Sequence, residues 1–121
     1  MKTYIVKRTS MGVRLAVEED DRRYPITPEA SLAVFPHSPD GFEMGYRGSG
    51  PAQLALAIIL DFFTGTAPDP EALAVEHHQA FKEAFIAPAK GAVLEIEGDA
   101  ITRWHGERIG LGAVAQEKEG A

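Results

Sequence analysis

The sequence predicts an α+β fold in which a small, mostly antiparallel sheet packs against about three helices. Two observations carry this prediction. Residues 13–17 alternate between apolar and other residues with the period of a half-buried strand. Residues 54–60 are apolar without interruption and follow a proline, which indicates a buried helix. The 121 residues are enough for one hydrophobic core, so we expect a single globular domain over residues 1–121.

The first elements are predicted to form an N-terminal β-hairpin. Residues 3–7 are rich in β-forming side chains, and turn residues at 9–12 separate them from the alternating segment 13–17. Three further short strands are predicted at residues 24–26, 32–35 and 92–97. Pro25 cannot donate to a neighbouring strand, so the segment 24–26 is expected at a sheet edge.

The central helix is predicted over residues 51–63, with Pro51 as its first residue and Ser49 or Gly50 as its cap. Its apolar side chains cover all faces, as in a helix that is covered on several sides. The residues expected to be least exposed are Leu56, Ile59, Leu60 and Phe63.

Two more helices follow in the sequence. Asp69 and Pro70 form a cap and a first turn for a helix over residues 70–87, on which Phe81 and Phe85 are expected to pack against the central helix. A third helix is predicted over residues 100–109, with Ile101, Trp104 and Arg108 on one face. Residues 116–121 are predicted to be a disordered tail.

The amino-acid composition limits the classes of partner that the chain is expected to bind. Twelve basic and 18 acidic residues give a net charge of −6, which argues against direct, unspecific binding to nucleic acid or to an anionic membrane. The same charge suits a partner protein with a basic surface. The chain has no cysteine, which excludes disulfides and thiolate metal sites and makes a cytoplasmic location the default expectation. The longest apolar run, residues 54–60, is too short to span a bilayer.

Four glycines gather at positions 41, 45, 48 and 50, directly before the central helix. Helix N-termini present free N–H groups that bind anions. The residues predicted to bind a ligand are Tyr46, Arg47, Gly48, Ser49 and Gly50, with His37 beside them. The alternative, which we favour, is that the glycines let the loop pack tightly against the helix.

No catalytic residue, metal site or cofactor is predicted. The loop lacks the lysine of a P-loop, and Ser49 lacks the glycine at position 47 that a nucleophile elbow requires. His77 and His78 diverge by ~100° on a helix, and no metal-ligand spacing links them to His37 or His105. His77 is expected to be a packed core histidine, and Asp61 a solvated surface carboxylate.

The chain resembles a family of small proteins of unknown function from bacterial, archaeal, plasmid and phage genomes. The resemblance rests on the opening strand at residues 4–9, on residues 37–58 (HSPDGFEMGYRGSGPAQLALAI), and on residues 79–82. The family tends to have Trp where this chain has Met44, and often Gly where it has Arg47. The resemblance implies a shared fold and a mobile-element setting, and it implies no activity.

These observations lead to ranked expectations. The first is a non-enzymatic binding protein of mobile-element type, an inhibitor of a host protein or defence complex with a basic surface. The alternative is a binder or sponge for a phosphate-bearing small molecule that uses the glycine-rich loop. An enzyme is the weakest hypothesis, because hydrolysis at Ser49 needs a base such as His37 nearby.

Overall fold

The computed structural model describes the backbone of residues 1–120 and the side chains of residues 1–110. The chain has an α+β fold with one four-stranded antiparallel sheet and the strand order β3-β2-β1-β4. The strands are β1 (Lys2–Thr9), β2 (Gly12–Glu19), β3 (Arg22–Ile26) and β4 (Val93–Glu97). The helices are α1 (Glu29–Val34), α2 (Ser49–Phe63), α3 (Pro70–Phe81), a π-helical turn η1 (Lys82–Ile86) and α4 (Gly98–Gly120).

The predicted hairpin is confirmed: β1 pairs with β2 over its whole length, from Lys2 opposite Glu19 to Thr9 opposite Gly12. Strand β3 lies at one edge, as Pro25 predicts. Strand β4 pairs with the other side of β1, so the N-terminal strand is central in the sheet. Alternate residues of the strands face the helices and are buried, among them Tyr4, Val6, Leu15, Val17 and Ile96.

The prediction of a strand at residues 32–35 is wrong, because this segment belongs mostly to helix α1. Pro28 holds the N-cap position, and the Ser31 hydroxyl donates to the Pro28 carbonyl at 2.8 Å. Ser31 is buried, and its neighbours Ala30 and Ala33 are exposed, which is a helical rather than an alternating pattern. A short apolar run with prolines on both sides does not distinguish the two structures.

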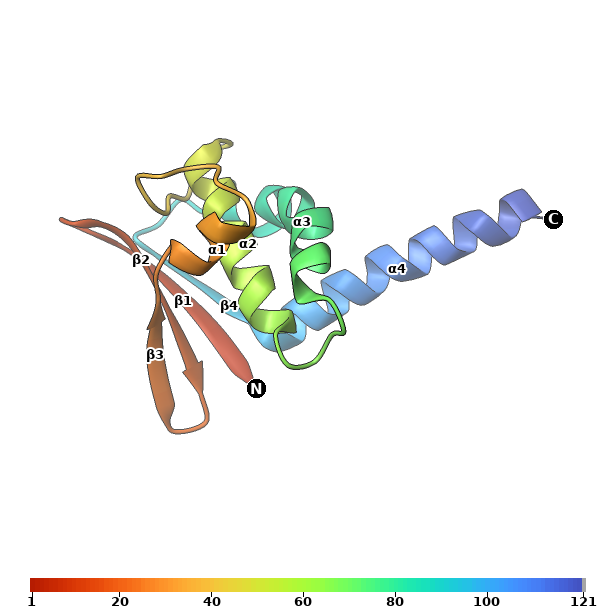
Figure 1. The fold of residues 1–121 in the computed structure, drawn as a ribbon, viewed down its shortest axis with the longest axis horizontal. Coiled ribbons are helices and arrows are strands. Elements are labelled where there is room, and N and C mark those ends of the chain that lie inside the picture. The colour runs from red at the N-terminus through yellow and green to blue at the C-terminus, as the bar shows by residue number, and fades with distance from the viewer. Residues whose placement is uncertain (121) are drawn as a thin grey trace.

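Helix α2 is the central element, and it lies between the sheet and helix α3 (Figure 1). Leu54, Leu56, Ile58 and Ile59 are fully buried, as predicted for an apolar helix. Two details differ from the prediction. The helix begins at Ser49 with Gly48 as its cap, and neither residue makes a side-chain capping bond. Leu60 is only partly buried, because it lines a surface cavity.

The second predicted helix is α3 followed by η1. Asp69 caps it as predicted, with its Oδ1 accepting a hydrogen bond from the Ala72 N–H at 3.0 Å. Phe81 is fully buried, and its ring lies 4.7 Å from that of Phe85 and 5.4 Å from that of Trp104 on α4. These rings fix α4 against α3.

Helix α4 differs from its prediction at both ends. It begins at Gly98 and its backbone is helical to Gly120, beyond the expected end near Ile109. The expected disordered tail covers residues 116–121. Their side chains lie outside the described part of the chain, and so does the backbone of residue 121. Among the described residues, no helix is both long and apolar enough to cross a membrane.

Candidate functional site

The glycine-rich loop is shaped by contacts with its own neighbours. Gly45 has φ +90°, and a Cβ there would lie 2.5 Å from the Arg8 guanidinium. A Cβ on Gly48 would lie 2.6 Å from the Tyr46 ring, and one on Gly50 would lie 2.6 Å from the Glu43 Cβ. A side chain therefore packs directly on each of these three glycines, and Gly45 is constrained further by its positive φ and by the Ala89 carbonyl, which would lie 2.7 Å from a Cβ. The contacts support the packing interpretation that we favoured from the sequence.

Arg8 of β1 holds this loop against the segment that follows η1. Its Nη2 donates to the Met44 carbonyl at 3.1 Å, and its Nε donates to the Gly91 carbonyl at 3.2 Å. The Gly45 N–H also donates to the Ile86 carbonyl at 3.0 Å. The two chain segments thus form fixed walls rather than independent loops.

Between these walls lies an open groove of about 350 Å³. Its lining residues are Gly45, Tyr46, Arg47, Glu83, Ala87, Pro88 and Lys90. The Arg47 Nε lies 2.7 Å from the Glu83 Oε2, and the Arg47 side chain is 79% exposed. An ion pair that exposed is weak, so Arg47 can exchange Glu83 for an external anion at small cost. Glu83 belongs to the π-helical turn, a structure that occurs frequently at functional sites.

The structure gathers only some of the residues predicted to bind a ligand. Tyr46 and Arg47 line the groove, and Tyr46 is 50% exposed. Gly48, Ser49 and Gly50 form the start of α2 and are absent from the groove lining. The helix start and the groove are therefore separate features, although they are continuous in the sequence.

His37 lies elsewhere, contrary to the expectation that it sits beside the loop. Its Nε2 is 2.8 Å from the His78 Nε2, and its ring stacks on Phe35 at 4.3 Å. The His78 Nδ1 is 2.9 Å from the carbonyls of both Ala74 and Val75, so this nitrogen carries the proton. The His78 Nε2 then accepts from the His37 Nε2–H. Burial lowers the pKa of His37, and the charges of His78 and Lys82 lower it further.

The buried amide of Gln53 was missed by the sequence analysis. Its Oε1 accepts from the backbone N–H groups of His37 at 2.7 Å and Ser38 at 3.0 Å. Its Nε2 donates to the Ser31 hydroxyl at 2.9 Å and to the Phe35 carbonyl at 3.2 Å. All four hydrogen-bonding positions of this fully buried amide are used, and they fix the segment that follows α1.

Asp61 is not the solvated carboxylate that we expected. Its Oδ2 accepts from the Tyr4 hydroxyl at 2.6 Å and from the Lys2 ammonium at 3.1 Å. Burial raises the pKa of Tyr4, and the bond to Asp61 raises it further. Burial lowers the pKa of Lys2, but the bonds to Asp61 and Tyr24 outweigh it, so that pKa is raised overall.

One feature of the sequence could have identified both the Gln53 amide and the Asp61 carboxylate. Gln53 and Asp61 are the only polar residues between positions 51 and 63. Residues eight apart point ~80° apart around a helix, so both polar residues mark one broad side of α2.

His77 and His78 point to different neighbours, as their adjacency predicts. His77 is 8% exposed, and its Nδ1 accepts from the Arg108 Nε at 3.3 Å. Its ring lies 5.0 Å from that of His105. Within residues 1–110, no three His, Cys, Asp or Glu side chains are arranged to hold a metal ion.

We compared the chain with protein families, curated proteins and solved structures. A family model described as a family of unknown function, DUF6166, matches residues 4–107. The chain belongs to the DUF6166 family. No curated protein and no solved structure matches the chain. The matched range includes most of β1, Gln53, Asp61 and the groove, and it leaves out Lys2, which bonds to Asp61, and Arg108, which bonds to His77.

Proposed function

We propose that this DUF6166 member is a non-enzymatic binding protein that docks its helical layer on a basic surface of a partner protein. The distribution of charge carries the proposal. Residues 24–81 hold seven acidic residues and one basic residue, Arg47, while the rest of the chain holds eleven of each. The whole net charge of −6 therefore lies in α1, α2, α3 and their connections. Opposite charge on a partner accelerates encounter and selects against other partners.

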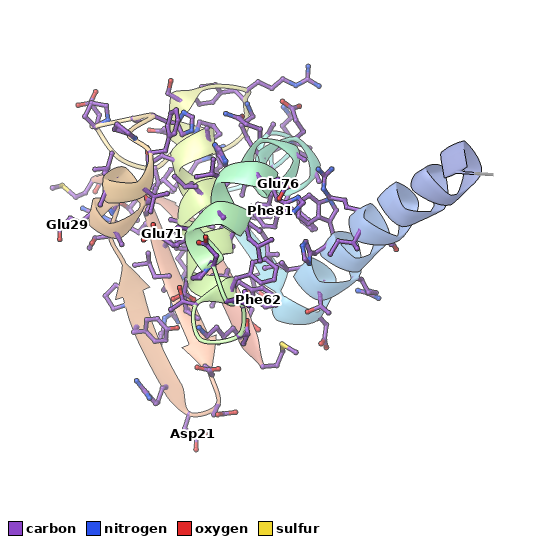
Figure 2. All side chains as sticks on the ribbon, turned by 45° about the vertical axis from the view of Figure 1, so that its right-hand side comes forward. Asp21, Glu29, Phe62, Glu71, Glu76 and Phe81 are labelled. Atoms are coloured by element: carbon purple, nitrogen blue, oxygen red, sulfur yellow. The ribbon has the colours of Figure 1, made fainter. Side chains whose placement is uncertain are left out.

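The docking face that we propose is formed by α1 and α3. Phe35 and Val75 are large apolar side chains with 46% and 44% exposure. The Phe35 ring lies 6.4 Å from that of His78, so the end of α1 meets α3 here. Three exposed carboxylates, Glu29, Glu71 and Glu76, come from the same two helices and are visible together in Figure 2. An apolar centre with a charged rim is the usual anatomy of a protein interface.

The partner class follows from the charge and the sequence resemblance. A protein that itself binds nucleic acid presents the basic surface that this face requires. Our proposal therefore includes a mobile-element origin, a cytoplasmic setting and inhibition of a host protein or defence complex. It includes no direct contact with nucleic acid or membrane.

A charge-reversal pair tests the proposal. The double variant E71K/E76K reverses two charges on α3, and E95K/E97K reverses two exposed charges on β4 as a matched control. Both variants have the same net charge. Capture from bacterial lysates at low and high salt should recover a partner with the wild type and the β4 variant, and lose it with the α3 variant or at high salt. Equal loss in both variants would show that only net charge matters and would refute a specific face.

A second candidate function rests on the groove. Arg47 and Lys90 supply two cations and Tyr46 an exposed ring, which together suit a phosphate attached to a planar group. Thermal-shift measurements with nucleotides, cyclic dinucleotides and sulfate test this candidate. A ligand at 100 times its Kd should add about 2.7 kcal/mol of stability. The shift should vanish in R47A/K90A and persist in R14A, which removes a cation from β2. Without any shift in the wild type, the candidate is excluded.

A further inference from the structure

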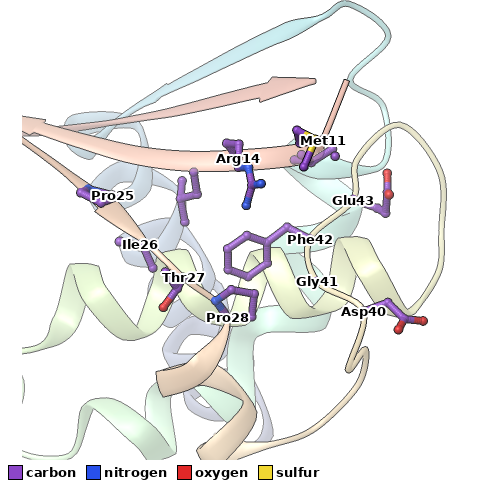
Figure 3. Close-up of a pocket in the computed structure, with 13 residues that line it drawn as sticks. Met11, Arg14, Pro25, Ile26, Thr27, Pro28, Asp40, Gly41, Phe42 and Glu43 are labelled. Carbon is purple, nitrogen blue, oxygen red and sulfur yellow. The ribbon is translucent and has the colours of Figure 1, made fainter. Parts of the chain in front are cut away.

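The end of β3 separates two cavities. Figure 3 shows one of them, about 240 Å³, between this strand end and the loop that carries Phe42. The other lies behind it, between β3, α1 and α2, and has a volume of about 280 Å³. Thr27 lines both, and in Figure 3 its hydroxyl points away from Phe42. We call the second cavity the Asp61 cavity, lined by Tyr24, Pro25, Ile26, Thr27, Ala30, Ser31, Ala57, Leu60, Asp61 and Thr64.

The walls of the Asp61 cavity are mostly apolar. Ile26 comes from the end of β3, and Ala57 and Leu60 come from helix α2. The back wall is rigid because the Ser31 hydroxyl is held between the Pro28 carbonyl and the Gln53 amide. Small-molecule sites are typically concave, mostly apolar and equipped with a few fixed polar groups. The volume of about 280 Å³ is just below their usual range of about 300–1,000 Å³, which suits a ligand the size of a single ring.

Asp61 is the polar group that gives this cavity its chemistry. Three protein donors converge on its Oδ2: the Tyr4 hydroxyl at 2.6 Å, the Lys2 ammonium at 3.1 Å and the Tyr24 hydroxyl at 3.5 Å. None of the described residues donates a hydrogen bond to its Oδ1. The three donors hold the carboxylate in place, and the Asp61 side chain lines the cavity and is 22% exposed.

We propose that the Asp61 cavity binds a small, uncharged molecule with an apolar ring and one hydroxyl donor, which bonds to the Asp61 Oδ1. The carboxylate oxygen only accepts, so the ligand must donate. Lys2 is already paired with Asp61, so a cationic ligand finds no unpaired carboxylate. A carboxylate ligand has no hydrogen to donate to the Asp61 Oδ1 and would place two acceptor oxygens against each other. The apolar walls favour a ring over a hydrated polar molecule.

Phenol is the probe that tests the proposal, with anisole, benzylamine and benzoate as matched comparisons. Each is titrated into the full-length ¹⁵N-labelled chain while backbone amide shifts are recorded. Phenol should produce saturable shifts centred on Thr27, Ala30 and Thr64. Anisole has the same ring without the donor and should bind at least about tenfold more weakly, the effect of losing one hydrogen bond to a charged acceptor. The two charged probes should also bind more weakly than phenol.

Blocking variants locate the site without disturbing Asp61, whose bonds to Tyr4 and Lys2 support the fold. Ala30 and Ala33 are both exposed on α1, but only Ala30 lines the cavity. Ala30→Leu should abolish phenol binding, and Ala33→Leu should leave it unchanged. The proposal is overturned if phenol gives no saturable shifts, if the shifts lie outside the cavity, if anisole binds equally well, or if both variants behave alike.

Discussion

Gln53 offers a sharp test of how this fold is held together. Replacing it with leucine keeps the side chain close in size but removes all four hydrogen bonds of the amide. The groups that lose their bond to the amide are the N–H groups of His37 and Ser38, the Phe35 carbonyl and the Ser31 hydroxyl. The Ser31 hydroxyl keeps its bond to the Pro28 carbonyl, and the His37 N–H keeps its bond to the Phe35 carbonyl at 3.2 Å. Gln53 and Ser31 are 0% and 1% exposed, so water does not replace the lost bond between them without a structural change.

The magnitude follows from the bond count. Four bonds that each contribute roughly 0.5–1.5 kcal/mol give a loss of about 2–6 kcal/mol. Burying leucine in place of an amide offsets roughly 1–2 kcal/mol of this loss. We therefore expect Gln53→Leu to lower the free energy of unfolding by about 1–4 kcal/mol, a substantial share of the roughly 5–15 kcal/mol typical of a domain.

Urea unfolding followed by the fluorescence of the single tryptophan, Trp104, measures this loss. Gln79→Leu is the matched control, since Gln79 is exposed on α3 and should change stability by less than about 0.5 kcal/mol. The amides of His37 and Ser38 should also exchange hydrogen faster in Gln53→Leu. A loss no larger than that of the control would refute the idea that this network holds the segment.

Three further predictions concern the core, the loop and pH. Leu56→Ala should cost about 2–5 kcal/mol in the same urea assay, because Leu56 is fully buried, and a loss below about 0.5 kcal/mol would contradict its burial. Gly45→Ala should cost about 1–3 kcal/mol or more, because φ is +90° and the new Cβ would lie 2.7 Å from a backbone oxygen; an unchanged urea midpoint would disprove this strain. Burial lowers the pKa values of His37, His77 and His105 below 6.5, so the unfolded chain takes up protons first. Stability should therefore be nearly constant between about pH 7 and 9 and fall as the pH drops below 6.5, and a rise in the urea midpoint on acidification would reverse this sign.

Much of the fold was readable from the sequence because the relevant signals are local. The hairpin follows from a β-rich segment and an alternating segment on the two sides of the turn residues 9–12, and the Asp69 cap follows from two adjacent residues. The central position of α2 follows from its apolar composition, since a helix with no polar face requires cover on every side. The glycines of the loop also showed where the backbone is crowded, although not by which side chains.

The tertiary structure alone decided where the polar groups meet. Tyr4 and Asp61 are 57 residues apart, and only the packing of α2 on β1 makes them partners. The same is true of Arg8, which bonds to both walls of the groove. Its partners Met44 and Gly91 are 36 and 83 positions away in the sequence. Helix α1 formed where the sequence suggested a strand, because the buried Gln53 amide provides a partner for Ser31 that local propensity does not contain. Short-range preferences determine elements within a few residues, whereas these sites depend on contacts that exist only after the elements pack.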